Sequence, residues 1–202
     1  KGQNYDSNSA DGDNITPLVI GQLQPVRTWG SLLERSLWHA AKRDRAVAAA
    51  AGALLPADTP AQIAAIMAAR RGARPSVGAM LSIEGLHNLE GKLANLDKLY
   101  AAGFRMAGLT HFFDNELAGS MHGEAKGGLT PFGRQVVRRM EELGMIVDIA
   151  HLSPRGVSDV LAMARRPVVS SHGGVQATCK VNRNLSDRQI RRIAANGGLI
   201  AI

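Results

Sequence analysis

Four side chains of types that bind metal ions stand at equivalent places along the sequence. Glu84, His111, His151 and His172 each come at the end of a short apolar run. Imidazole nitrogens and carboxylate oxygens are good ligands for Zn²⁺ and similar divalent ions. A carboxylate can hold two such ions close together, and the pair can activate water near neutral pH and polarise a carbonyl group. The residue types therefore suggest metal-dependent hydrolysis.

The spacing of these residues requires a fold that gathers distant segments. Glu84 and His151 are 67 positions apart, and His151 and His172 are 21 positions apart. A single histidine after a strand is more often a hydrogen-bonded structural residue than a ligand, but four equivalent positions in succession favour a joint site. The other histidines do not share this placement: His39 is expected within a helix and His122 in a loop. His87, three residues past Glu84, could line the same mouth, but a loop residue is the default expectation.

The elements that must position the four residues alternate between strand and helix. The predicted strands are short apolar runs, and most of the predicted helices follow a Ser or Thr cap, often with Pro at the first helical position. This alternation predicts parallel βα units. Strands are expected at 76–83, 104–110, 145–150, 168–171 and 197–202, and helices at 91–102, 131–144, 154–166 and 187–196.

The predicted fold class is α/β, and the polar residues at the strand ends distinguish two architectures. In a (β/α)8 barrel the carboxyl ends of the strands converge on one mouth, whereas an open doubly wound sheet spreads them along an edge. The sequence also lacks the Gly-x-Gly-x-x-Gly fingerprint of dinucleotide-binding sheets. We therefore expect a (β/α)8 TIM-type barrel of the metal-dependent hydrolase kind, incomplete in this chain.

The first third of the chain is less regular than the rest. Residues 1–14 are rich in Asn, Asp, Ser and Gly and predict a loop or a frayed end. Helical spacing of apolar residues then runs over 15–53, and a second helix over 60–71 follows Thr59. We expect one partial-barrel domain over 1–202, with variable loop and helices in 1–75 and the βα units that carry the site in 76–202.

The composition excludes several classes of protein. The chain is 45% hydrophobic, too apolar for a disordered segment, and Cys179 is its only cysteine, which excludes a disulfide scaffold. Cys179 also has no adjacent base that would make it a nucleophile. No apolar stretch approaches the roughly 20 residues of a membrane helix. The net charge of +7 suggests nucleic-acid binding only weakly, because no aromatic residues interleave with the arginines.

One arginine lies close to the histidine series. Arg183 follows His172 by eleven residues, in the loop after the same predicted strand. A guanidinium there could hold a substrate carboxylate through two hydrogen bonds. From the spacing alone, a surface arginine is the better interpretation.

Several short motifs resemble those of the membrane (renal) dipeptidase family of zinc metallopeptidases and its bacterial relatives. The resemblance extends from about residue 77 to 202, and the order and spacing of the motifs make it specific. Residues 1–75 resemble the family's early region only loosely. The matching segments are Ser-Ile-Glu-Gly-Leu-His at 82–87, Gly-Leu-Thr-His at 108–111, Gly-Leu-Thr-Pro-Phe-Gly at 128–133, Asp-Ile-Ala-His-Leu-Ser at 148–153, Ser-His at 171–172 and Asn-Arg-Asn at 182–184.

This resemblance implies hydrolysis of dipeptides by water activated between two zinc ions on a (β/α)8 barrel, with tolerance for a D-residue at the C-terminal position. Glu84 is then expected to bridge the two metals, and His151 and His172 to complete the second metal site. His111 is expected to contact the substrate and to stabilise the developing oxyanion. Arg183 is expected to engage the substrate.

The chain departs from the family pattern at both ends. The family's first strand carries a His-x-Asp pair that completes the first metal site, and its last strand carries an acidic residue that handles the proton. The 202 residues contain neither. We therefore expect a sequence truncated at both ends, which by itself binds the first metal poorly and has little or no activity.

Two other interpretations stay open. One is another amidohydrolase-like hydrolase on the same barrel, acting on a lactone, an amide or a phosphoester, because fold does not determine substrate. The other is a non-catalytic binding protein that lacks the first metal pair. We expect a dipeptide substrate, no nucleic-acid partner and no membrane-spanning segment. A homodimer is left open, since an incomplete barrel exposes strand edges, and the sequence indicates neither the compartment nor the native metal.

Overall fold

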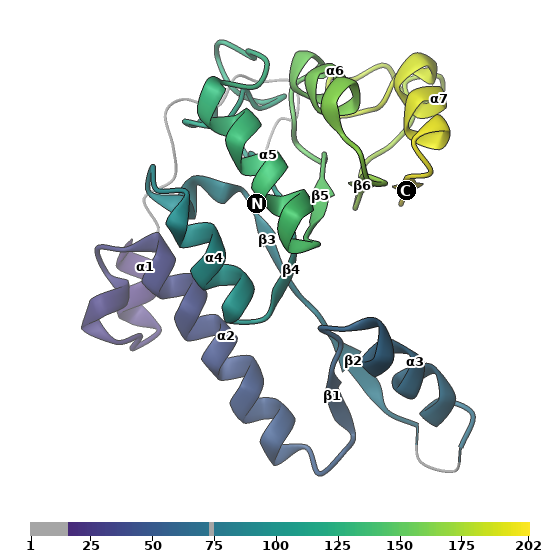
Figure 1. The fold of residues 1–202 in the computed structure, drawn as a ribbon. Coiled ribbons are helices and arrows are strands. Elements are labelled where there is room, and N and C mark those ends of the chain that lie inside the picture. The colour runs from purple at the N-terminus through teal and green to yellow at the C-terminus, as the bar shows by residue number, and fades with distance from the viewer. Residues whose placement is uncertain (1–15, 73–74) are drawn as a thin grey trace.

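The computed structural model describes residues 16–72 and 75–202, and most of these residues surround one parallel sheet of five strands (Figure 1). Neighbours in the sheet follow chain order without a reversal, which is the order in a barrel and not in a doubly wound sheet. The strands are β3 (Leu81–Glu84), β4 (Phe104–Gly108), β5 (Ile146–Asp148), β6 (Val169–Ser170) and β7 (Leu199–Ile200).

A helix connects each strand of this sheet to the next. The helices are α4 (Ala94–Ala101), α5 (Pro131–Leu143), α6 (Pro154–Met163) and α7 (Asp187–Ala195). Their predicted starts are confirmed for three of them: Thr130, Ser153 and Ser186 each cap a helix by accepting a hydrogen bond from a backbone N–H one turn ahead. The predicted 91–102 helix begins later, at Ala94, because a short 3-10 turn, η2 (Leu86–Leu89), occupies the segment after β3.

The core lies between the sheet and these helices. Helix α5 contributes Val136, Val137 and Met140, all completely buried, while its arginines face outward. The largest fully buried side chains come from every connecting segment of the sheet: Leu86, Leu89, Leu96, Leu99, Leu109, Leu117, Ile149, Val160 and Ile193. Burial on this scale holds the strand ends in fixed positions, as a site assembled from several strands requires.

The helical stretch expected over 15–53 is wrong as a single element. It forms α1 (Thr16–Gly21), a 3-10 turn η1 (Val26–Thr28) and α2 (Leu32–Ala49), which packs against α4. Pro25 precedes η1, and Ser31 starts α2 by accepting a hydrogen bond from Glu34 N–H, so local caps interrupt the apolar periodicity. The loop expected at 1–14 lies outside the described residues.

The strand expected at 76–83 is also wrong as a single element. It is divided at Met80: β2 (Val77–Ala79) pairs with β1 (Leu54–Pro56) in a separate two-stranded sheet, and only β3 joins the five-stranded sheet. β1 falls in a region expected to hold only loop and helices. With α3 (Pro60–Ala69), β1 and β2 form a lobe, residues 54–79, that projects from the main body (Figure 1).

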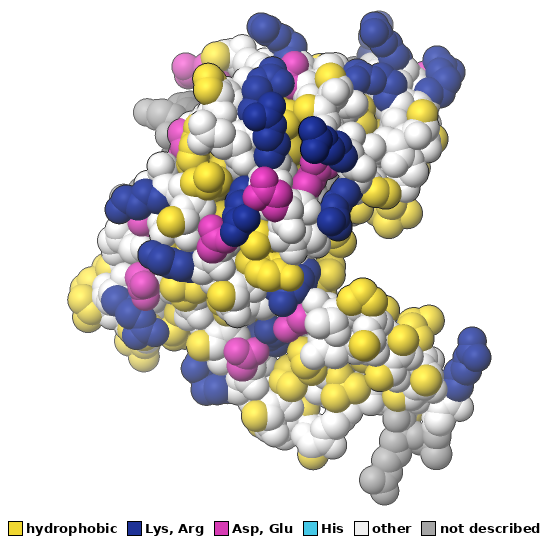
Figure 2. Space-filling view, viewed as in Figure 1, with side chains coloured by type: hydrophobic (Ala, Val, Ile, Leu, Met, Phe, Trp, Pro, Cys, Tyr) yellow, Lys and Arg dark blue, Asp and Glu magenta, His cyan; other side chains and the backbone are white. Residues whose placement is uncertain are grey.

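The two parts of the molecule have different surfaces. Figure 2 shows Lys and Arg side chains spread over the main body and apolar side chains gathered on the lobe. Ile63, Met67 and Val77 of the lobe are among the exposed large hydrophobic residues. Within 16–72 and 75–202, no helix is both long and apolar enough to span a bilayer.

Candidate metal centre

Three of the predicted ligands converge at the carboxyl end of the five-stranded sheet. Glu84 Oε1 lies 3.0 Å from His151 Nε2 and 3.1 Å from His172 Nε2, and the two Nε2 atoms are 2.8 Å apart. Glu84 is the last residue of β3, whereas each histidine stands two or three residues beyond its strand. The sheet therefore brings three segments of the chain to one point.

The other oxygen of Glu84 faces a different imidazole. Glu84 Oε2 lies 3.4 Å from His111 Nε2. One oxygen of the carboxylate therefore faces His151 and His172, and the other faces His111. The turn after Glu84 requires a glycine, because Gly85 has a φ of +96° and a Cβ there would lie 2.7 Å from the His87 ring. The half-exposed Glu84 carboxylate stands at the centre of the cluster, because its two oxygens face three imidazoles.

His151 is positioned by its backbone. Its φ of +63° is in the left-handed region, which is uncommon for a residue with a side chain. Its carbonyl accepts hydrogen bonds from the Thr110 hydroxyl at 3.1 Å and from Met121 N–H at 2.9 Å. These contacts fix the strained residue between the loops that follow β4 and β5, as is common at functional sites. Only 3% of the side chain is exposed.

His172 is positioned by side chains that the sequence analysis did not single out as site residues. Its Nδ1 lies 2.8 Å from the hydroxyl of Ser171, which donates a hydrogen bond to the buried Asp148 at the end of β5. Asp148 and Ser171 both occur in the matching motifs, but from the sequence alone each would be interpreted as an ordinary strand-end or loop residue. Their relation to His172 follows only from the pairing of β5 with β6.

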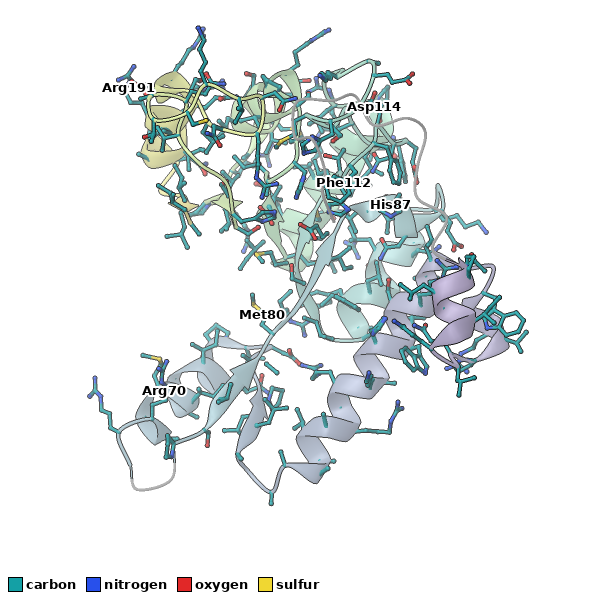
Figure 3. The ribbon with its side chains drawn as sticks, turned by 180° about the vertical axis from the view of Figure 1, so that it is seen from behind. Arg70, Met80, His87, Phe112, Asp114 and Arg191 are labelled. Carbon is teal, nitrogen blue, oxygen red and sulfur yellow. The ribbon has the colours of Figure 1, made fainter. Side chains whose placement is uncertain are left out.

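The loop after β4, which contains His111, is hydrogen-bonded within itself and to the loop after β6. Asp114 accepts hydrogen bonds from the N–H groups of Ser120 and Ala125, which closes the loop on itself. Ser120 Oγ donates to the His111 carbonyl, and Asn182 donates to the Met121 carbonyl at 2.8 Å. In Figure 3, Asp114 and Phe112 of this loop lie at the same end of the molecule as His87, away from Met80.

Arg183 lies near His172, as its spacing allowed. Both residues line a small cavity of about 10 Å³ between the loops after β4, β5 and β6, together with Met121 and Asn182. Arg183 is half-buried, and its charge helps to lower the pKa of His172, where burial is the larger cause. The structure thus places the guanidinium beside the cluster rather than on a remote surface.

The electrostatics of the cluster favour an anionic carboxylate and neutral imidazoles. The hydrogen bond with His151, together with the neighbouring histidine charges, lowers the pKa of Glu84 to about 2. Burial lowers the pKa of His111 to about 4, although the Glu84 carboxylate opposes this shift. Near neutral pH, Glu84 offers negative oxygens and His111 and His172 offer lone pairs, which are the protonation states that metal binding requires.

The remaining histidines and the cysteine lie in varied surroundings. His39 is exposed on α2 beside Trp38. Cys179 is exposed and is a free cysteine, as expected. His87 belongs to η2 and packs against Phe113. His122 lies in a loop, as expected, but its side chain is buried and its ring lies 5.8 Å from that of His151. His122 therefore lies beside His151 at the edge of the cluster.

The donor set fits a divalent ion of the zinc type. Two imidazole nitrogens and one carboxylate oxygen lie within 4.8 Å of one another, the only such group found in 16–72 and 75–202. The two Nε2 atoms and the Glu84 oxygen face one another closely enough for their lone pairs to be shared with one cation. Three protein ligands with open positions are typical of catalytic zinc.

The fold and this cluster together define a class, the α/β-barrel hydrolases that use metal ions at the strand ends. The sequence profile of the membrane dipeptidase family (peptidase family M19) matches residues 33–202. The chain belongs to this family of metallopeptidases. Its five-stranded sheet is accordingly part of a TIM-type barrel.

Individual relatives are consistent with this assignment. An uncharacterized dipeptidase of Schizosaccharomyces pombe is 34% identical over 126 residues, which are 60% of this chain and 30% of the relative. Among solved structures, the probable dipeptidase PvdM of Pseudomonas aeruginosa matches 80% of this chain and 41% of its own, at 27% identity and a TM-score of 0.73. The chain therefore spans less than half the length of these relatives.

A further solved relative was determined with a ligand. A metallo peptidase of Rhodobacter sphaeroides, 26% identical with a TM-score of 0.65, was crystallised with a phosphinate mimic of the dipeptide L-Ala-D-Ala. The match covers 76% of this chain and 44% of that one.

Proposed function

We propose that the full-length protein hydrolyses dipeptides at a centre of two zinc ions to which Glu84, His151 and His172 are ligands. The observation that carries this proposal is the convergence of Glu84 Oε1, His151 Nε2 and His172 Nε2 within hydrogen-bond distance of one another. Bound zinc supplies Lewis acidity and a water of lowered pKa. Membership of a metallopeptidase family supports the same conclusion.

Glu84 is proposed to bridge the two ions. Its Oε1 faces His151 and His172, while its Oε2 points away from them toward His111. A carboxylate whose oxygens face two directions, and whose pKa is held near 2, can serve two cations at once. The chain has no His-x-Asp sequence, so the further ligands that the family resemblance implies are not among these residues.

His111 and Arg183 are proposed to act on the substrate. His111 Nε2 lies 3.4 Å from Glu84 Oε2, close enough to the metal ligands to donate a hydrogen bond to a carbonyl oxygen as it becomes negative. Arg183 is proposed to bind the carboxylate of a dipeptide, because it lines the same small cavity as His172 and a guanidinium forms paired hydrogen bonds with a carboxylate. The mimic of L-Ala-D-Ala bound by the Rhodobacter relative supports a substrate that ends in a D-residue.

Metal analysis and a substrate panel test this proposal. The full-length protein, purified without chelator, is expected to contain about two zinc ions per chain and to cleave dipeptides in preference to lactones and phosphoesters. His172→Ala is expected to lose one ion and the activity, whereas His39→Ala, a matched change of an exposed histidine, should lose neither. Zinc absent even after its addition would overturn the metal centre, and a lactone or phosphoester preference would overturn the peptidase assignment.

The isolated 202-residue chain should behave differently from the full-length protein. It is expected to bind the first metal poorly and to have little or no dipeptidase activity, because it holds only part of the ligand set. Measurement of zinc content and dipeptide turnover on the chain itself checks this expectation. Robust turnover would show that these residues suffice for catalysis.

A further inference from the structure

Asp148 is a carboxylate buried at the end of β5, with only 5% of the residue exposed. Its Oδ1 accepts hydrogen bonds from Ala150 N–H and Ser171 N–H, both at 3.0 Å, and its Oδ2 accepts one from the Ser171 hydroxyl. A buried carboxylate costs free energy unless it is hydrogen-bonded, and these three hydrogen bonds hold both oxygens of Asp148 in fixed positions.

The direction of these hydrogen bonds assigns a proton on His172. A hydroxyl can donate only one hydrogen bond, and the Ser171 hydroxyl donates it to the Asp148 carboxylate. A carboxylate can only accept hydrogen bonds. At 2.8 Å from His172 Nδ1, the same oxygen must then accept a hydrogen bond from that nitrogen. The Nδ1 of His172 therefore carries the proton, and in the neutral ring its Nε2 carries the lone pair.

The Nε2 lone pair points to the place where the ligands converge. His172 Nε2 lies 2.8 Å from His151 Nε2 and 3.1 Å from Glu84 Oε1. Without Asp148, the Ser171 hydroxyl would be free to donate to Nδ1 and so favour the opposite tautomer, with a proton on Nε2. That tautomer cannot bind a metal until it rearranges.

The two histidines of the cluster are held in different ways, which makes the relay specific to His172. His151 Nδ1 has no hydrogen-bond partner among the described residues, and this residue is fixed by its backbone instead. Asp148 stands three positions before His151 on the same strand end and reaches across to Ser171 after β6. The relay therefore also sets the spacing between the segments that carry the two histidines.

We propose that Asp148 is a positioning residue that acts through Ser171 to hold His172 in the tautomer and orientation needed for metal binding. The inference rests on the proposed function in one respect, that His172 is a metal ligand. It goes beyond that function by assigning roles to two residues that do not themselves touch the metal or the substrate. Outer hydrogen bonds of this kind change metal affinity about 10- to 100-fold in other proteins.

The test uses the full-length protein and two variants, Asp148→Asn and Ser171→Ala. Zinc affinity is measured by competition with a chromophoric chelator, and the tautomer of His172 in the metal-free protein by imidazole ¹⁵N chemical shifts assigned with His172→Gln. Both variants are expected to bind the zinc ion of the site that includes His172 about 10- to 100-fold less tightly. Asp148→Asn is also expected to raise the fraction of His172 protonated at Nε2. Ser158→Ala, which removes an exposed hydroxyl on α6, is the matched control and should change neither readout.

The outcomes separate this inference from the proposed function. If both variants keep the zinc affinity and the tautomer of the parent protein, the relay is wrong while His172 can still be a ligand. If the variants melt at lower temperature without either change, Asp148 is only structural and the relay is again wrong. If His172→Gln leaves zinc binding unchanged, the proposed metal centre itself is wrong.

Discussion

The lobe of residues 54–79 and the five-stranded sheet are built from the same unit, yet a carboxylate after a strand has a different use in each. In the lobe, Asp58 follows β1 and pairs with Arg43 of α2 at 2.8 Å. In the main sheet, Glu84 ends β3 and faces three imidazoles instead of a fixed cation. A carboxylate at a strand end is therefore not a site by itself, and the groups that face it decide its role.

The two regions also differ in how completely their apolar side chains are buried. The lobe leaves Ile63, Met67 and Val77 exposed, while each connection of the main sheet contributes completely buried large side chains to the core. The Arg43–Asp58 pair joins the lobe to α2, whereas Glu84 and the histidines that face it lie beside the main core. Changes in the two regions should have separable effects on function and on stability.

The largest expected effect contrasts the two carboxylates. Glu84→Gln in the full-length protein should reduce dipeptide hydrolysis by more than about 100-fold, because loss of a ligand exceeds loss of an outer hydrogen bond. Asp58→Asn should leave turnover within about twofold but lower the free energy of unfolding by about 1–2 kcal/mol, since it removes one charged hydrogen bond of Arg43, which keeps its pair with Asp44. Turnover assays and urea unfolding check both. Equal loss of turnover in the two variants would contradict the separate roles of Glu84 and Asp58.

A matched pair of methionines compares the packing of the regions. Met140→Ala, in the fully buried face of α5, should lower the free energy of unfolding by about 2–5 kcal/mol through lost burial and a cavity. Met67→Ala, at a side chain 53% exposed on α3, should change it by no more than about 0.5 kcal/mol. Denaturant midpoints measure both. A large effect at Met67 would mean that another part of the protein covers the lobe.

The response to acid should distinguish the regions as well. His111 has a pKa lowered from 6.5 to about 4, so in the metal-free protein the unfolded state takes up its proton first and stability falls from about pH 6.5 toward 4. Glu84 has a pKa lowered from 4.5 to about 2, so its contribution is present above pH 4.5 and is lost as the pH falls toward 2. Both shifts therefore make acid destabilising.

Hydrogen exchange locates this acid response. Amides around the cluster should lose protection on acidification before those of the lobe, because residues 54–79 contain no histidine. Glu84→Gln should reduce the stability loss below pH 4.5 by the contribution of Glu84, while the His111 contribution between pH 6.5 and 4.5 stays. Uniform loss of protection across both regions would argue against a response that begins at the cluster.

The smallest expected effect concerns two helix caps. Thr59 caps α3 in the lobe and Ser186 caps α7 on the main sheet, each in a capping box with a glutamine. Replacing either by alanine should cost about 1 kcal/mol. If the lobe and the sheet unfold together, both variants shift one common transition. If Thr59→Ala lowers protection in the lobe alone, the lobe opens independently.

Local sequence predicted the repeating elements well because their signals are local. The caps at Thr130, Ser153 and Ser186 and the short apolar runs after them predict βα units to within a few residues. Signals of pairing are not local, and so the division at Met80 and the strand β1 were missed. An apolar run predicts extended chain but not which strand will pair with it.

The same distinction applies to the candidate site. The sequence by itself determined which residues could bind metal, since Glu84, His111, His151 and His172 have the right donors at the right places in repeated units. Only the tertiary structure decided how they are oriented, because parallel pairing of β5 with β6 brings Asp148 to Ser171 and the fold holds His151 in its left-handed backbone. Ligand identity is a property of single residues, whereas tautomer, strain and distance arise from contacts between segments far apart in the chain.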